Sequence, residues 1–381
     1  MVSLPPELWL AIFRHAVTTG LTASLFSTTY QPFEVTSETS TDHSLKVKLT
    51  IIRVCKLWRD LAISLLYEDL LVLHEYSGDL RRALERRMDE EATEGSRSRR
   101  VCLPYSSTVP QMATKYPTDA VTILTRCPSL EVLSRPSMVY GSQGEFELFE
   151  YAAEDCPPLP SLKRLDWWHR NDAARSGGVN CLVDVLQAAP NITYLSLEGE
   201  LGLSVMQLNS EIVLAGLTTL RLRRVNMLFI LQISKWSFPS LETVILDGYT
   251  NTFMLQNVGS AFGGRLKRLE LGRSLRFYIN DVLSHIFEWC PTLEEINYYA
   301  YFTYAPDLLP APHQHLTAVG LHGVKNPIFM DHEPHHWHHL EAHFATYCVA
   351  ESYLALRTIR LHGDWQHVFS HPEYPSWVDN L

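Results

Sequence analysis

The stretch Leu162-Lys163-Arg164-Leu165-Asp166-Trp167 decides the fold, because its apolar residues at the first, fourth and sixth positions keep returning along the chain. The apolar and polar residues of its second half alternate, which is typical of a strand with one buried face. The pattern returns at Leu130–Leu133 in shortened form, then at Ile192–Leu197, Leu217–Leu222, Leu241–Leu246, Leu266–Leu271, Leu293–Tyr298, Leu316–Leu321 and Leu356–Leu361.

Helix-like stretches separate these phrases, and each ends at a proline shortly before the next leucine. Three of them are Cys181–Ala189 with Pro190, Met227–Lys235 with Pro239, and Asp281–Cys290 with Pro291. Proline disfavours continuation of a helix, so the order strand, loop, helix, proline repeats. A unit of this kind buries its leucines only against its neighbours. We therefore expect an α/β fold, a curved solenoid with a parallel sheet inside and helices outside.

The phrase resembles the Leu-x-x-Leu-x-Leu core of leucine-rich repeats. Most intervals between first leucines are about 25 residues, within the range of that family. The chain departs from the strict consensus, because no asparagine follows the third leucine at the usual place. An irregular leucine-rich-repeat domain is therefore expected over residues 119–381.

The first residues of the chain predict two amphipathic helices. Leu4, Leu8, Ile12 and Ala16 recur every four residues, which places them on one helical face. A second helical pattern runs from about Leu45 to Leu71. Two helices of this size cannot cover each other's apolar faces completely. Either the rest of the chain or a partner must cover the remainder.

The same residues carry a family resemblance. Leu4-Pro5-Pro6-Glu7-Leu8, Ile12-Phe13 and Val54-Cys55-Lys56-Leu57-Trp58-Arg59-Asp60-Leu61-Ala62 closely resemble the F-box signature. In that family the segment is a small all-α module that docks on the Skp-type adaptor of a cullin-RING (SCF) ubiquitin ligase. The resemblance covers residues 1–72 and implies an adaptor-binding surface made of Leu4, Pro5, Leu8, Ile12, Val54, Trp58 and Leu61. The alternative is that these helices merely cap the downstream domain.

A long spacer separates the two halves of the signature. Thirteen of the 27 residues at 18–44 are Ser or Thr, and no helical period runs through them. We expect a solvated loop bulging from the module; the alternative is a loop controlled by phosphorylation. Residues 73–118 form a connector of mixed charge, for which an exposed helix or solvated linker is expected.

Composition restricts the partners and the compartment. The formal charge is −10 and no long run of Lys or Arg offsets it, so nucleic acid is not an expected partner. Neither a secretory signal nor an apolar run long enough for a membrane span is present in the sequence. The seven cysteines are widely spaced without a Cys-x-x-Cys, which favours reduced, buried thiols over a disulfide frame or a zinc site. A cytoplasmic or nuclear protein is expected.

Residues 331–343 contain a histidine-rich run. His335, His339 and His343 would share one helical face, a spacing that can bind zinc. The run contains no His-Glu-x-x-His, so we expect no metal site and favour a polar helix or pH-sensitive loop. Phosphate-binding loops and nucleophile motifs are also missing from the sequence, so neither an enzyme nor a cofactor is expected.

Side chains alternate across a strand, so the residues between the leucines should face the exposed side of the sheet. This column is rich in residue types that dominate binding hot spots. The candidates for target binding are Arg164, Trp168, Tyr194, Arg221, Arg223, Arg268, Tyr299 and Arg360. Arg221, Arg223 and Arg268 stand nearest the middle of the array, where an acidic or phosphorylated segment is expected. The alternative is a solvated sheet face with binding by the loops.

These features together predict the substrate-recognition subunit of an SCF-type ligase, in which the N-terminal module binds the adaptor and the repeats bind an unknown target protein. The alternative is a stand-alone leucine-rich-repeat scaffold without association to a ubiquitin ligase. An enzyme of unrecognised type is the third reading.

Overall fold

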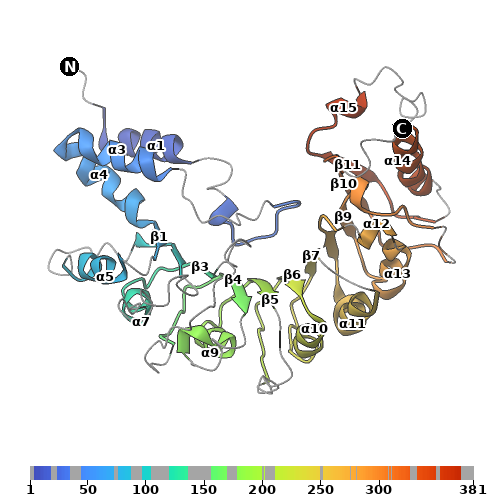
Figure 1. Cartoon of the computed structure of the whole chain (residues 1–381), viewed down its shortest axis with the longest axis horizontal. Helices are drawn as coiled ribbons and strands as arrows, with labels where there is room; N and C mark the ends of the chain where they lie inside the picture. The colour runs from blue at the N-terminus through green and yellow to red at the C-terminus, as the bar shows by residue number, and fades with distance from the viewer. Residues whose placement is uncertain are drawn as a thin grey trace. The chain divides into compact units, whose positions relative to one another are not determined.

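The chain has a mixed α/β fold built on a parallel sheet of eleven strands, which follow one another in sequence order from β1 to β11 (Figure 1). The computed structural model describes residues 4–18, 24–34, 44–72, 76–86, 97–103, 120–135, 156–169, 178–199, 201, 211–248, 252–274, 276–279, 281–307, 309, 311–326, 333–348 and 352–369.

Every predicted phrase forms a strand, and each strand begins at the third residue of its phrase. The strands are β3 Val132–Arg135, β4 Arg164–His169, β5 Tyr194–Gly199, β6 Thr219–Val225, β7 Thr243–Asp247, β8 Arg268–Leu271, β9 Glu295–Tyr299, β10 Ala318–His322 and β11 Thr358–His362. Apolar residues at equivalent positions of the phrase stand opposite one another, as Leu165 does with Leu195 and Val244 with Leu269. The predicted parallel sheet is therefore confirmed.

Two further strands have no phrase and were missed. They are β1 Asp69–Leu71 and β2 Arg100–Cys102, which pair with each other and, through β2, with β3. A buried ion pair joins them, because Arg100 Nη1 lies 2.8 Å from Asp69 Oδ1. The sequence predicted that a helix continues to Leu71 and that Arg100 lies in an exposed helix or a solvated linker. Both predictions are wrong. Both stretches belong to the sheet, where a charged pair can be buried because it is hydrogen-bonded.

The chain forms two compact units. The first comprises Met1–Tyr30 and Glu34–Leu217, and the second comprises Gln31–Phe33 and Thr218–Leu381. Both units contain strands and helices. The boundary between Leu217 and Thr218 falls within the repeat domain predicted for residues 119–381.

The first unit begins with three helices that pack on one another. They are α1 Pro6–Val17, α3 Leu45–Val54 and α4 Lys56–Tyr67. Phe13, Val17, Ile51, Ala62 and Leu65 form their buried core. The expected single helix from Leu45 is broken at Cys55, whose backbone is extended and whose Sγ accepts a hydrogen bond from the Trp58 N–H. A cap of this kind starts a new helix, because it satisfies an N–H that lacks a helical partner.

Further helices of the first unit lie on one side of its strands (Figure 1). They are α5 Ser77–Arg86, α7 Ala120–Thr125, the 3-10 turn η3 Gly178–Asn180 and α9 Leu182–Ala188. The predicted helix at Cys181–Ala189 is thus confirmed as α9. Leu165, Leu182 and Leu195 have no exposed surface, so the repeated leucines form the core as expected.

The second unit repeats this arrangement of strand and helix. Its helices are α10 Met227–Ile233, α11 Thr252–Phe262, η5 Gly263–Arg265, α12 Arg276–Ile279, α13 Val282–Trp289, η6 Ala300–Phe302, α14 Glu333–Cys348 and α15 Gln366–Phe369. The predicted helices at Met227–Lys235 and Asp281–Cys290 are confirmed as α10 and α13. Within the described ranges, none of the helices has the length and apolar character needed to cross a membrane.

Candidate functional site: the covered sheet face and the N-terminal helices

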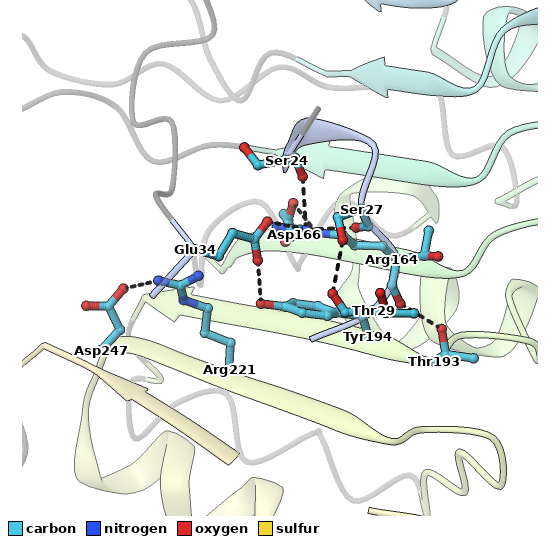
Figure 2. A network of polar contacts seen from close by, with 11 residues as sticks. Ser24, Ser27, Thr29, Glu34, Arg164, Asp166, Thr193, Tyr194, Arg221 and Asp247 are labelled. Carbon is cyan, nitrogen blue, oxygen red and sulfur yellow. Dashed lines mark hydrogen bonds and ion pairs between the residues drawn. The ribbon is translucent and has the colours of Figure 1, made fainter. Parts of the chain in front are cut away.

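The described part of the Ser/Thr-rich spacer does not bulge into solvent. Within the first unit, Ser24–Tyr30 and Glu34 lie on the side of the strands opposite α7 and α9, against β4 and β5 (Figures 1 and 2). Glu34 is buried, with 8% of its surface exposed. Thr193 Oγ1 donates a hydrogen bond to the Thr28 carbonyl at 3.3 Å. The prediction of a solvated loop is therefore wrong for these residues.

The contact centres on Arg164 of β4 and Tyr194 of β5. Arg164 Nη1 lies 2.6 Å from Glu34 Oε1, and the Tyr194 hydroxyl donates to Glu34 Oε2 at 3.2 Å (Figure 2). The same Arg164 nitrogen donates to the carbonyls of Ser27 at 2.9 Å and Ser24 at 3.5 Å. One cation thus binds both the carboxylate and the backbone of the segment.

Asp166 completes the charge arrangement. Its Oδ2 accepts from Arg164 Nε at 2.9 Å, and the guanidinium carbon lies 4.4 Å from the centre of the Tyr194 ring. Burial by itself would lower the pKa of Arg164, but the charges of Asp166, Tyr194 and Glu34 outweigh it and raise that pKa. Arg164 therefore stays protonated although only 5% of its side chain is exposed.

In the second unit, Phe33 packs among three rings of the strands. Its ring centroid lies 5.1 Å from that of Tyr299, 5.0 Å from His322 and 4.9 Å from His362. The Phe33 N–H donates to Glu270 Oε2 at 2.9 Å. Aromatic pairs at such separations contribute beyond the area they bury.

The arginines expected to hold an acidic target segment are bonded within the second unit. Arg221 Nη2 lies 2.6 Å from Asp247 Oδ2, and Arg223 Nε lies 3.9 Å from the same oxygen. Arg268 Nε donates to Thr243 Oγ1 at 2.9 Å, and its Nη2 lies 3.6 Å from Glu242. Their charges are therefore compensated by acidic or polar groups of neighbouring repeats.

The eight candidate target-binding residues were selected because side chains alternate across a strand. The structure confirms that alternation, but the expectation that these side chains are exposed is wrong at several positions. Arg164, Tyr194, Arg221 and Tyr299 are buried. The other four candidates, Trp168, Arg223, Arg268 and Arg360, keep more exposed surface. Glu34 covers Arg164 and Tyr194 in the first unit, and Phe33 packs on Tyr299 in the second, which no local pattern reveals.

Sequence reasoning missed Phe33 and Glu34 altogether. The available signal was composition, since the spacer is polar except for apolar and aromatic residues in its middle, which include Leu25, Phe26, Tyr30 and Phe33. Large apolar side chains inside a Ser/Thr-rich stretch indicate a segment that packs against something.

The residues of the F-box-like signature divide into two groups. Trp58 and Leu61 pack against the core of the helices, and the Trp58 ring centroid lies 4.8 Å from Trp9 and 4.9 Å from Phe13. The others are exposed: Leu4, Pro5, Leu8, Ile12 and Val54. Half of the Leu8 surface and 56% of the Val54 surface are exposed.

Three further exposed apolar residues on these helices were not selected by sequence reasoning. Leu45, Val47 and Leu57 are 44%, 39% and 52% exposed. Eight exposed apolar residues thus lie on or just before these three helices, five from the signature and these three; Leu4 and Pro5 precede α1. Exposed apolar residues that gather in a patch mark contacts with other molecules.

Two histidines of the histidine-rich run bind protein groups. The predicted helix is confirmed as α14; the side chain of His335 lies outside the described residues. His343 Nε2 lies 3.0 Å from the Thr303 carbonyl and its Nδ1 lies 2.9 Å from the Tyr298 hydroxyl. His339 Nε2 lies 2.7 Å from the Ala300 carbonyl. Both Nε2 atoms thus face backbone carbonyl oxygens, and no group of three metal-ligating side chains occurs among the described residues.

Comparison with known proteins adds no family: no protein-family model matches the chain, and no curated protein is similar to it.

Proposed function

We propose that the chain is the substrate-recognition subunit of an SCF-type ubiquitin ligase. In this proposal α1, α3 and α4 form an all-α F-box module that docks on a Skp-type adaptor. The strand–helix units form a curved leucine-rich-repeat solenoid that binds a target protein. The chain itself supplies binding and no catalysis, and it acts in the cytoplasm or nucleus.

The exposed apolar surface of the N-terminal helices carries the proposal. Leu8, Ile12 and Val54 match the signature and are each about half exposed, while Trp58 and Leu61 hold the helices together. Burying one large apolar side chain contributes about 1.5–3 kcal/mol. A partner that covers several of these residues would gain enough free energy for a stable complex after the cost of association.

Co-purification with a Skp-type adaptor tests the proposal. The full chain should capture the purified adaptor, and the double variant Leu8→Ser/Ile12→Ser should lose it. Phe253→Ser on α11 is the matched control, because Phe253 is a 59% exposed apolar residue on the second unit. Adaptor capture that survives the double variant, or that never occurs with the intact chain, contradicts the proposal. The latter result favours the stand-alone repeat scaffold, which needs no adaptor.

A further inference from the structure

We propose that Arg164 and Tyr194 form a binding site for an acidic side chain on a peptide, and that Ser24–Glu34 is its resident occupant. A target segment that carries a carboxylate would displace it. The inference deepens the proposed target-binding role of the strands and rests on it.

The contacts are of the kind that a sheet face makes with a peptide ligand. Backbone carbonyls of Ser24 and Ser27 accept from Arg164, and the carbonyl of Thr28 accepts from Thr193. Backbone groups are common to all peptides, so these bonds recognise a peptide backbone whatever its side chains are.

The bonds of Glu34 bring a charged group of the segment to these strands, and they supply the selectivity. Among the described contacts, Glu34 places one oxygen on Arg164 and the other on the Tyr194 hydroxyl. Both charged side chains are almost fully buried, at 5% for Arg164 and 3% for Glu34. A charge-assisted bond in such a place is strong, whereas a neutral replacement leaves a guanidinium without its second anion.

The site keeps its geometry when the occupant leaves. Asp166 holds Arg164 through Nε, on the other edge of the guanidinium from the Nη1 that meets Glu34. A departing Glu34 therefore exposes a cation that is already oriented and ready for another carboxylate. A preorganised site of this kind spends little free energy on ordering its own side chains.

The core of the N-terminal helices does not depend on the occupant, although Phe33 anchors the occupant separately through its packing on Tyr299, His322 and His362. The core of α1, α3 and α4 consists of Phe13, Val17, Ile51, Ala62 and Leu65, none of which belongs to Ser24–Glu34. The chain on both sides ties the segment close to its site, which gives a local concentration of about millimolar order. A competing peptide must overcome that concentration, so the wild-type site is partly closed to weak acidic ligands.

Peptide binding to the full chain tests this inference. The probe is a fluorescent, amidated peptide of Ser24–Glu34, compared with the same peptide in which Gln replaces the glutamate. Glu34→Gln weakens the resident contact, so this variant should bind the acidic probe about tenfold more tightly than the wild type does. Arg164→Gln added to Glu34→Gln should abolish the gain, and the Gln peptide should bind the single variant about tenfold more weakly.

Glu288→Gln is the matched control, because Glu288 is a 75% exposed carboxylate on α13. It should leave probe affinity at the wild-type value. Equal affinity of wild type and Glu34→Gln for the probe, or undiminished binding after loss of Arg164, overturns the inference and makes Ser24–Glu34 a fixed structural strap.

Hydrogen exchange on the unaltered chain gives a second test that needs no variant. Saturating acidic peptide should raise the exchange of amides in Ser24–Glu34, and unchanged exchange there overturns the inference. Adaptor capture separates this failure from failure of the proposed function. A chain that captures the adaptor without peptide displacement rejects the occupant alone, whereas peptide displacement without adaptor capture rejects the ligase assignment alone.

Discussion

Glu34 Oε1 lies 2.6 Å from Arg164 Nη1, although 130 positions separate the two residues in the sequence. The carboxylate comes from the spacer between two helices, and the guanidinium comes from the first residue of β4. This ion pair joins the N-terminal part of the first unit to its strands. Through this pair, a part of the Ser/Thr-rich spacer packs against the face formed by β4 and β5.

The first prediction concerns the strength of that pair. A double-mutant cycle with Glu34→Ala and Arg164→Ala should give a coupling free energy of about 1.5–3 kcal/mol, because the bond is charge-assisted and buried. The exposed pair of Asp79 and Arg82 on α5 is the control and should give about 0.3–0.5 kcal/mol. Chemical denaturation of the four chains in each cycle measures both values. Similar couplings in the two cycles would show that burial does not strengthen the Glu34–Arg164 pair.

The second prediction separates adaptor docking from folding. Leu8→Ser/Ile12→Ser should change the free energy of unfolding by about 0.5 kcal/mol or less per site, because both side chains are exposed. Trp58→Ala should cost about 2 kcal/mol or more, since its ring packs on Trp9 and Phe13. Thermal unfolding checks the difference. A double variant as unstable as Trp58→Ala would place Leu8 and Ile12 in the core instead of on a docking surface.

The third prediction is a loss of stability in mild acid. Burial, with a further contribution from His339, lowers the pKa of His343 well below its usual value. Burial likewise lowers the pKa of His322 to about 4. Because the unfolded chain binds these protons near pH 6.5 and the folded chain does not, stability is complete above that pH and falls as pH drops toward 4.

His343→Gln tests the histidine that contributes most clearly. Glutamine can still bond the Thr303 carbonyl and the Tyr298 hydroxyl but cannot become charged. The variant should therefore remove about 2 kcal/mol of the stability difference between pH 7 and pH 5. Denaturation at the two pH values measures it, with His15→Gln on the exposed side of α1 as control. An unchanged difference in the His343 variant would show that this histidine does not titrate on unfolding.

The fourth prediction concerns thiol reactivity. Burial raises the pKa of Cys102 to about 11 and that of Cys290 to about 12, whereas Cys55 is exposed at the start of α4. Because the thiolate is the reactive form, iodoacetamide at pH 8 should modify Cys55 before the buried Cys102 and Cys290. Peptide mapping by mass spectrometry measures the rates. Bound adaptor should protect Cys55, which stands between the exposed Val54 and Leu57, and an unchanged Cys55 rate would place the docking surface elsewhere.

The strands that carry a repeat phrase were predictable because their signal is local. Apolar residues at alternate positions of Leu162–Trp167 specify a strand with one buried face, and the proline after Cys181–Ala189 marks where that helix ends. The helical face of Leu8 and Ile12 was equally plain, although α1 begins at Pro6 and leaves Leu4 outside the helix. Each of these patterns is complete within one turn or one strand, so no knowledge of distant residues is needed.

The sequence by itself therefore determined the repeated strand–helix unit and the amphipathic start of the chain. The tertiary structure decided which apolar residues of that start are core and which are exposed, because Trp58 and Leu8 belong to the same signature and differ in what packs on them. It also decided that Glu34 covers Arg164. A polar segment without periodicity has no structure of its own, so its place depends on a partner far along the chain, and burial of that charge requires the partner to be there.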